Sequence, residues 1–154
     1  MEVTFDGGGW WAYLLVFVAA ATPVIEVFFV IPAAMLAGLP AVPVALVAVA
    51  GNLATVVLVA LAGERMLGWW RRRRPSRDRA ASSRSERSRA IVERWGVPGA
   101  ALLAPITTGT HVATLAALAT GSGIRRTLRW MGFGLVVWAV VVAIASAFGL
   151  DLLA

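Results

Sequence analysis

Four long apolar runs leave this chain little choice of fold. They cover residues 10–39, 42–61, 97–119 and 130–150 of a 154-residue sequence that is 60% hydrophobic. A helix needs about 20 apolar residues to cross a bilayer, so each run is long enough to enter one deeply. A soluble domain of this length could not bury so much apolar surface. We therefore expect an all-α integral membrane protein.

The positive charges indicate how the chain is oriented. All 14 cationic residues are arginines. Most lie between Arg65 and Arg94, and a second group contains Arg125, Arg126 and Arg129. Because basic loops of membrane proteins face the cytoplasm, we expect both groups to lie inside the cell and both chain ends outside.

The basic loop also suggests a partner. We expect residues 70–96 to form a cytoplasmic loop that ends in a short helix on the membrane surface, because Ser83 and Glu86 have capping-box spacing. Packing of this helix on the protein itself is the alternative. The arginines between Arg71 and Arg94 are expected to contact anionic lipid headgroups rather than nucleic acid.

The first and third runs begin and end on the same side if this orientation holds. Each has roughly 25–30 residues, whereas two crossings need about 40. We predict re-entrant helical hairpins at residues 10–39 and 97–122, and full spans at residues 42–69 and 126–150. A four-span bundle with both termini inside is the structural alternative. The acidic start MEVTFDGGG lacks the basic region of a signal peptide, so we expect the first run to be retained.

Helix-breaking residues coincide with the predicted hairpins. Pro23 and Pro32 interrupt the first run, and Pro105 and Gly109 interrupt the third. Irregular backbone at membrane depth persists only where protein or a wet cavity covers it. We therefore expect the two hairpin tips to face each other between the spans.

A weak internal repeat relates the two hairpins. At a displacement of about 82 positions, or one more, prolines and glycines recur, a pattern typical of repeat-built transporters. The pairs are Pro23 and Pro105, Gly38 and Gly121, and Gly51 and Gly134. Together with the opposite entry sides, this predicts an inverted repeat of membrane halves 1–69 and 97–154.

Glu26 and His111 are the residues that most strongly suggest chemistry. A carboxylate costs on the order of 3 kcal/mol at a bilayer centre, so Glu26 must be protonated or paired. Capping of a broken helix is a structural explanation; a proton or substrate pathway is a functional one. His111, the single histidine, lies in the opposite hairpin, and an imidazole can exchange a proton near neutral pH. We expect the two to pair.

Polar residues nearby complete the predicted site. Thr107, Thr108 and Thr110 are expected to line it, although threonines also satisfy backbone groups freed by a helix break. Asn52, inside the second run, is expected to support the site by hydrogen bonding to a neighbouring helix.

Enzyme signatures are weak. With one histidine and no cysteine, the chain cannot build a common zinc site, and we expect neither a metal nor a cofactor. The glycine-rich stretches lack the strand context of a nucleotide-binding loop.

Several segments resemble the bacterial small multidrug export protein family. They are PVIEVFFVIPAAMLAGLPAVP, AGN, RWGVPGAALLAPITTGTHVA and RRTLRWM, which together cover nearly the whole chain. That family is similar to DedA-type membrane proteins, whose members carry paired re-entrant hairpins and are implicated in moving lipid carriers. The resemblance implies a DedA-like fold in the bacterial inner membrane. Unlike many relatives, this chain has no arginine directly behind Glu26, which argues against phosphate recognition by arginine at that tip.

These observations predict a transporter or lipid translocase. Its substrate would be small and amphipathic or lipid-linked, and movement would be coupled to protons through Glu26 and His111. A non-transporting scaffold or assembly factor is the alternative, and an intramembrane enzyme a further one. We expect a homodimer; alanines recur at helical spacing in the last run, which allows close helix packing either within the chain or across a dimer. They are Ala139, Ala143 and Ala147.

Overall fold

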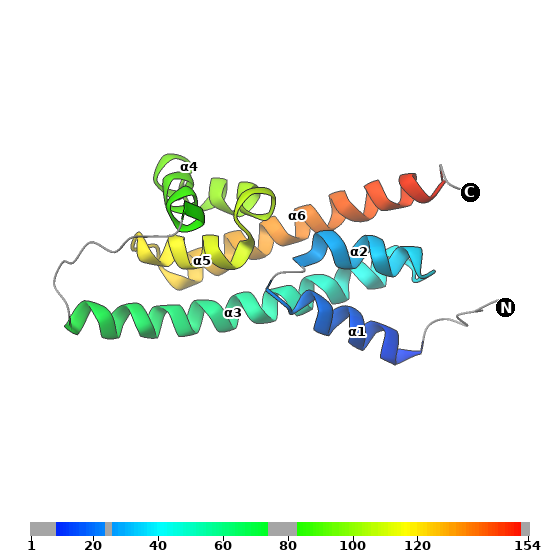
Figure 1. The fold of residues 1–154 in the computed structure, drawn as a ribbon, viewed down its shortest axis with the longest axis horizontal. Helices are drawn as coiled ribbons and strands as arrows, with labels where there is room; N and C mark the ends of the chain where they lie inside the picture. The colour runs from blue at the N-terminus through cyan, green and yellow to red at the C-terminus, as the bar shows by residue number, and fades with distance from the viewer. Residues whose placement is uncertain (1–8, 24–25, 74–82, 152–154) are drawn as a thin grey trace. The chain divides into compact units, whose positions relative to one another are not determined.

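The described part of the chain is built from helices. In the computed structural model it comprises residues 9–23, 26–73 and 83–151, where no strand occurs (Figure 1). The helices are α1 (Trp10–Ala20), α2 (Glu26–Leu36), α3 (Ala41–Arg73), α4 (Ser83–Thr107), α5 (Thr110–Ala119) and α6 (Ile124–Asp151). Two stretches are long and apolar enough to cross a membrane: Ala41–Trp69 in α3 and Ile124–Leu150 in α6. The prediction of an all-helical chain with two long apolar helices is confirmed.

The chain divides into two compact units, and each long helix contributes to both. The first unit comprises Met1–Ala54 and Val136–Ala154, and so contains α1, α2, the start of α3 and the end of α6. The second comprises Thr55–Leu135, with α4, α5, the end of α3 and the start of α6.

In the first unit, α1 and α2 form a helical hairpin (Figure 1). Each has 11 residues, about 16 Å of helix, so neither alone crosses a hydrocarbon core of about 30 Å. Pro32 lies inside α2 and does not interrupt it, contrary to the break expected there. Because Pro32 has no N–H, the Phe28 carbonyl loses its intrahelical donor. Phe28 lies close to the start of the helix, and no other carbonyl is affected. The Phe28 ring also lies 5.2 Å from the ring of Trp138 on α6.

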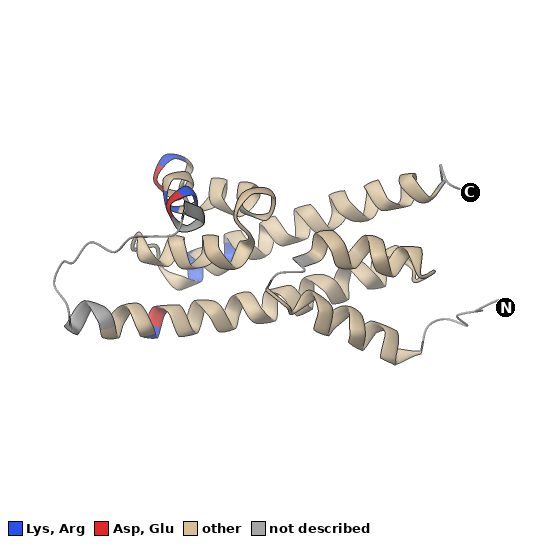
Figure 2. Ribbon diagram, viewed as in Figure 1, with Lys and Arg blue, Asp and Glu red and all other residues tan. Residues whose placement is uncertain are grey.

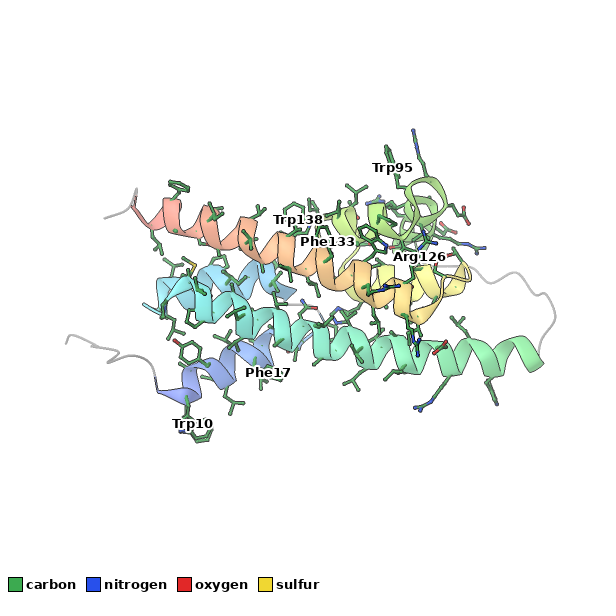
Figure 3. All side chains as sticks on the ribbon, turned by 180° about the vertical axis from the view of Figure 1, so that it is seen from behind. Trp10, Phe17, Trp95, Arg126, Phe133 and Trp138 are labelled. Atoms are coloured by element: carbon green, nitrogen blue, oxygen red, sulfur yellow. The ribbon has the colours of Figure 1, made fainter. Side chains whose placement is uncertain are left out.

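Helix α1 crosses α3 at a glycine. A Cβ atom on Gly51 would collide with the carbonyl group of Phe17. The crossing therefore requires a residue without a side chain at this point of α3. Figure 3 marks Phe17 on α1.

In the second unit, α4 consists of two helical segments joined at Gly96. This residue has φ +68° and ψ −174°, a conformation that only glycine adopts readily. In the segment before the kink, Ser88 and Val92 are buried at 1% and 7% exposure, whereas Trp95 is 60% exposed. This segment therefore packs one face on the protein. The Arg94 guanidinium carbon lies 5.6 Å from the centre of the Trp95 ring.

The segment of α4 after the kink crosses α6 at a second glycine. A Cβ atom on Gly134 would collide with the carbonyl group of Ala101. Pro105, four residues after Ala101, has no N–H to donate to that carbonyl. The proline thus leaves a carbonyl oxygen at the point where the helices approach most closely, and Gly134 makes room for it.

Both units end their hairpins in the same way. Gly38 and Gly121 have φ values of +87° and +90°. Leu39 N–H donates to the Ala34 carbonyl at 3.1 Å, and Ser122 N–H donates to the Ala117 carbonyl at 3.0 Å. Each end is a Schellman motif, in which a residue with positive φ lets the chain satisfy the last helical carbonyls.

The pattern of burial recurs with the displacement that relates Gly38 to Gly121. At nine pairs of corresponding positions both residues are buried, although the residue types differ. The pairs are Val27 and Thr110, Val30 and Ala113, Ile31 and Thr114, Ala34 and Ala117, Met35 and Leu118, Val44 and Thr127, Ala48 and Met131, Asn52 and Leu135, and Val56 and Ala139. The same helical faces are therefore covered in both sequence halves.

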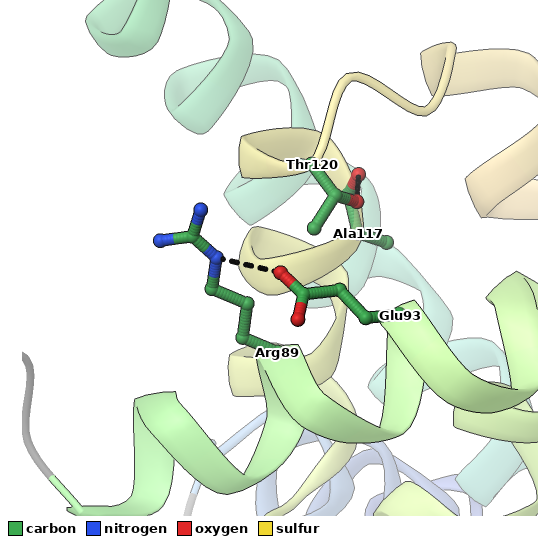
Figure 4. A network of polar contacts seen from close by, with 4 residues as sticks. All are labelled: Arg89, Glu93, Ala117 and Thr120. Atoms are coloured by element: carbon green, nitrogen blue, oxygen red, sulfur yellow. Dashed lines mark hydrogen bonds and ion pairs between the residues drawn. The ribbon is translucent and has the colours of Figure 1, made fainter.

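Charge is distributed unequally between the units. Among the side chains that the structure describes, every charged one belongs to the second unit (Figure 2). These residues are Glu64, Arg65, Glu86, Arg87, Arg89, Glu93, Arg94, Arg125, Arg126 and Arg129. Arg89 and Glu93 form an exposed ion pair at 3.2 Å one helical turn apart (Figure 4). The described side chains of the first unit carry no charge.

The glycine crossings yield a stability prediction. Gly51→Ala and Gly134→Ala should each lower the apparent melting temperature in detergent, because overpacking typically costs about 1–3 kcal/mol. Gly68→Ala is a matched control, since nothing lies within 4 Å of a Cβ at that helical position. Melting can be followed by tryptophan fluorescence. Equal melting temperatures for all three variants would contradict the close crossings.

Candidate functional site

The break between α4 and α5 is the most polar buried place in the described structure. Gly109, the N-cap of α5, has φ +87° and ψ +145°, and no side chain caps the helix. Around this break lie Thr108, Thr110 and His111, with exposures of 4%, 1% and 7%. Pro105 lies inside α4, which continues to Thr107, so the interruption expected at Pro105 is wrong; the positive φ of Gly109 permits the reversal.

His111 is joined to a second helix of the same unit. Its Nε2 atom lies 3.1 Å from Thr55 Oγ1 on α3, within hydrogen-bond distance. A threonine hydroxyl can donate or accept, so this pair can form with either ring tautomer. The contact connects the hairpin of the second unit to a long apolar helix through polar atoms.

The threonines at the break have different environments. The Thr107 hydroxyl is exposed and donates to the Leu103 carbonyl in its own helix at 2.8 Å. Thr114 donates to the Thr110 carbonyl at 2.7 Å, and Thr120 donates to the Ala117 carbonyl at 2.8 Å (Figure 4). The Thr108 hydroxyl is buried without a hydrogen-bond partner. Thr108 is therefore available to a ligand or water, whereas Thr107 serves its own helix.

The residues predicted in the first unit are less directly described. Asn52 is fully buried on α3. Glu26 is the first residue of α2, but its side chain lies outside the described part of the structure. The pairing of Glu26 with His111 therefore stays a prediction.

Thr55, Thr114 and Thr127 were not predicted from the sequence. Thr114 and Thr127 are fully buried, and both hydroxyls bond to carbonyls of their own helix, at Thr110 and Gly123. Thr55 follows Asn52 by three positions, so one helical face of α3 carries both polar groups. That spacing was the available signal for Thr55.

The site has the chemistry of hydrogen bonding rather than of metal binding. Within the described residues, no group of three histidine, cysteine, aspartate or glutamate side chains could hold a metal ion. What the break does offer is one imidazole and several hydroxyls away from water. Such groups can bind a polar head or transfer a proton.

Two apolar grooves lie in the first unit. One, of about 360 Å³, runs between the start of α3 and the end of α6, with Ala45, Val49, Ala139 and Ala143 in its lining. The other, of about 450 Å³, lies between α1 and α2. Their linings are almost wholly apolar, which suits a hydrocarbon chain.

Comparison with known proteins identifies one family. The model of the family described as “Putative small multi-drug export protein” matches residues 26–141, from the start of α2 into the second half of α6. No curated protein and no solved structure matches the chain significantly. The matched region includes Asn52, Thr55 and the whole α4–α5 break.

The contact between His111 and Thr55 can be tested by an isosteric change. Thr55→Val keeps the shape but removes the hydroxyl, so the buried ring nitrogen loses this partner at a cost of about 1–3 kcal/mol. The apparent melting temperature should fall by several degrees. Thr22→Val is the control, because the Thr22 hydroxyl bonds only to the Val18 carbonyl of its own helix. Similar melting of both variants would show that the pair contributes little.

Proposed function

Since the chain belongs to the small multi-drug export protein family, we propose that it is a membrane transporter of a small amphipathic or lipid-linked substrate. The observation that carries the proposal is the buried polar group at the α4–α5 break of an otherwise apolar chain. Burying hydroxyls and an imidazole in an apolar interior costs free energy unless they are hydrogen-bonded. In membrane proteins such groups mark substrate or ion pathways.

We propose that the two helical hairpins are re-entrant and that the fold is a DedA-like inverted repeat. The arms of about 16 Å support this, because each reaches only partway across the hydrocarbon core. The matched Schellman motifs and the recurring burial pattern support a common origin of the two sequence halves. In this arrangement α3 and α6 cross the bilayer fully.

The chemistry proposed for the site follows from its donors and acceptors. His111 takes up and releases a proton, and the Thr55 hydroxyl orients its ring. Thr108 and Thr110 bind the polar head of the substrate, and Asn52 supports them. Glu26 is the acid that pairs with His111 during the cycle. Thr107 lines the approach from its exposed position.

An amphipathic substrate suits the chain for a second reason. The grooves of the first unit have no charged lining and could hold a hydrocarbon tail. Apolar grooves of this kind favour a substrate with a hydrocarbon part over a wholly polar solute.

The alternative is a membrane scaffold or assembly factor. In that case the polar residues at the break would serve only to satisfy a broken helix, as the bond from Thr107 to Leu103 does. We propose no catalytic reaction, metal or cofactor. An intramembrane enzyme is the further alternative; it would need a hydroxyl nucleophile activated by His111, and a turnover assay that depends on both Thr55 and His111 would favour it.

We place the protein in the bacterial inner membrane with its basic loop in the cytoplasm, in contact with anionic headgroups through the arginines between Arg71 and Arg94. The exposed positions of Arg87, Arg89 and Arg94 support this partner. A homodimer completes the proposal.

Transport should depend on the two titratable residues. In proteoliposomes, Glu26→Gln and His111→Ala should each reduce the flux of a fluorescent amphipathic dye or lipid at least tenfold, because neither residue could then carry a proton. Thr120→Val, which removes an exposed hydroxyl bonded to the Ala117 carbonyl at the far end of α5, is the control and should keep its flux.

Two results would discriminate the alternatives. Unaltered flux in both variants, with normal reconstitution, would remove the transport mechanism. The scaffold would be supported if the wild type gives no flux above empty liposomes and both variants melt at a lower temperature than the wild type.

The hairpin architecture predicts from which side of the membrane an impermeant reagent reaches each hairpin end. The chain has no native cysteine, so single cysteines can be introduced at Ala37, which is exposed, and Ser122, which is partly exposed. An impermeant maleimide should label Ala37→Cys only from outside the cell and Ser122→Cys only from inside. Labelling of Ser122→Cys from outside would mean that the third apolar run crosses the membrane completely.

A further inference from the structure

The first turns of α6 have two opposite faces. Thr127, Met131 and Leu135 are 0%, 0% and 1% exposed and recur every fourth residue, so they form the buried face. Residues on the opposite side are exposed, and their order along the helix runs from cationic to aromatic. They are Arg125, Arg126, Arg129, Trp130 and Phe133. Figure 3 marks Arg126 and Phe133 on this helix.

Among the residues that the structure describes, no acid pairs with these three arginines: the ion pair there joins Arg89 and Glu93, and no acid lies in the first turn of α6. The N-terminal end of a helix carries partial positive charge, so cations in its first turns are unfavourable unless an anion is nearby. Three exposed arginines at this place favour an anion bound from solvent or from a lipid.

The residues that follow indicate where that anion lies. Arg126, Trp130 and Phe133 are spaced by four and three residues and so share a face of α6. The Trp130 and Phe133 rings meet edge to face at 5.9 Å between centroids. The order guanidinium, indole, phenyl spans about 10 Å of helix, and it matches the order of phosphate, interface and hydrocarbon in one leaflet.

We propose that Arg125, Arg126 and Arg129 bind the phosphate of an anionic phospholipid headgroup, with Trp130 at the interface beneath it. Guanidinium groups bind phosphate oxygens through paired N–H donors, which gives arginine an advantage over lysine at such a site. A zwitterionic headgroup carries its own cation and compensates the three arginines less well. This site is separate from the basic loop and requires only that Ile124–Leu150 enters the bilayer, not that the protein transports anything.

The test compares lipids of different charge. The full-length protein in detergent is titrated with dioleoylphosphatidylglycerol or dioleoylphosphatidylcholine, and the apparent melting temperature is recorded by tryptophan fluorescence. The anionic lipid should raise it by several degrees more than the zwitterionic lipid. In the variant Arg125→Gln/Arg126→Gln/Arg129→Gln, most of this difference should disappear.

A charge-matched control separates a site from general attraction. Arg65→Gln removes one exposed cation of α3 that lies outside the Arg71–Arg94 segment, and it should retain most of the lipid difference, whereas Arg126→Gln should lose more of it. The single variant Arg126→Gln, examined by native mass spectrometry for bound phosphatidylglycerol, serves if the triple variant fails to fold.

Three outcomes would overturn the proposal. The first is equal stabilisation of the wild type by both lipids, and the second is a loss in the charge-matched control as large as in the α6 variant. The third is reproduction of the full effect of the anionic lipid by inorganic phosphate, which would assign the arginines to a soluble anion. None of these outcomes bears on the flux through Glu26 and His111.

Discussion

The need to satisfy backbone hydrogen bonds inside an apolar chain determines this structure. Every regular element in the described residues is a helix, and the breaks between helices are closed locally. Gly38 and Gly121 turn the chain at positive φ and return the last carbonyls to N–H donors. Where proline removes a donor, as at Pro105, the freed Ala101 carbonyl lies against Gly134. The same few glycines and prolines thus determine both where helices pack closely and how the backbone groups at helix breaks are hydrogen-bonded.

Much of this arrangement is readable in the sequence, because it depends on local chemistry. The length of the apolar runs predicts the two long helices, and the capping-box spacing from Ser83 predicts the start of α4. The proline at position 32 was misleading, since a helix tolerates proline where only an early carbonyl loses its donor. Sequence patterns weigh proline by type, whereas the outcome depends on its position in the helix.

The polar site was partly predictable for a related reason. Polar residues in apolar runs are few, so His111, Thr108 and Asn52 were recognisable, and all are buried. Thr55 was not, because one threonine in a spanning helix is unremarkable until its distant partner is known. The repeat also hides the difference between the sequence halves: Val27 and Ile31 in one correspond to Thr110 and Thr114 in the other. A common backbone frame therefore carries an apolar and a polar version of the same hairpin face.

The uneven distribution of charge bears on how the chain is made. No lysine or arginine occurs before Arg65, so the nascent chain delivers α1, α2 and most of α3 to the insertion machinery without a cation. Positive residues are what retain a segment on the cytoplasmic side during insertion. Under that rule the arginines that orient the amino-terminal helices, from Arg65 to Arg129, are translated after those helices.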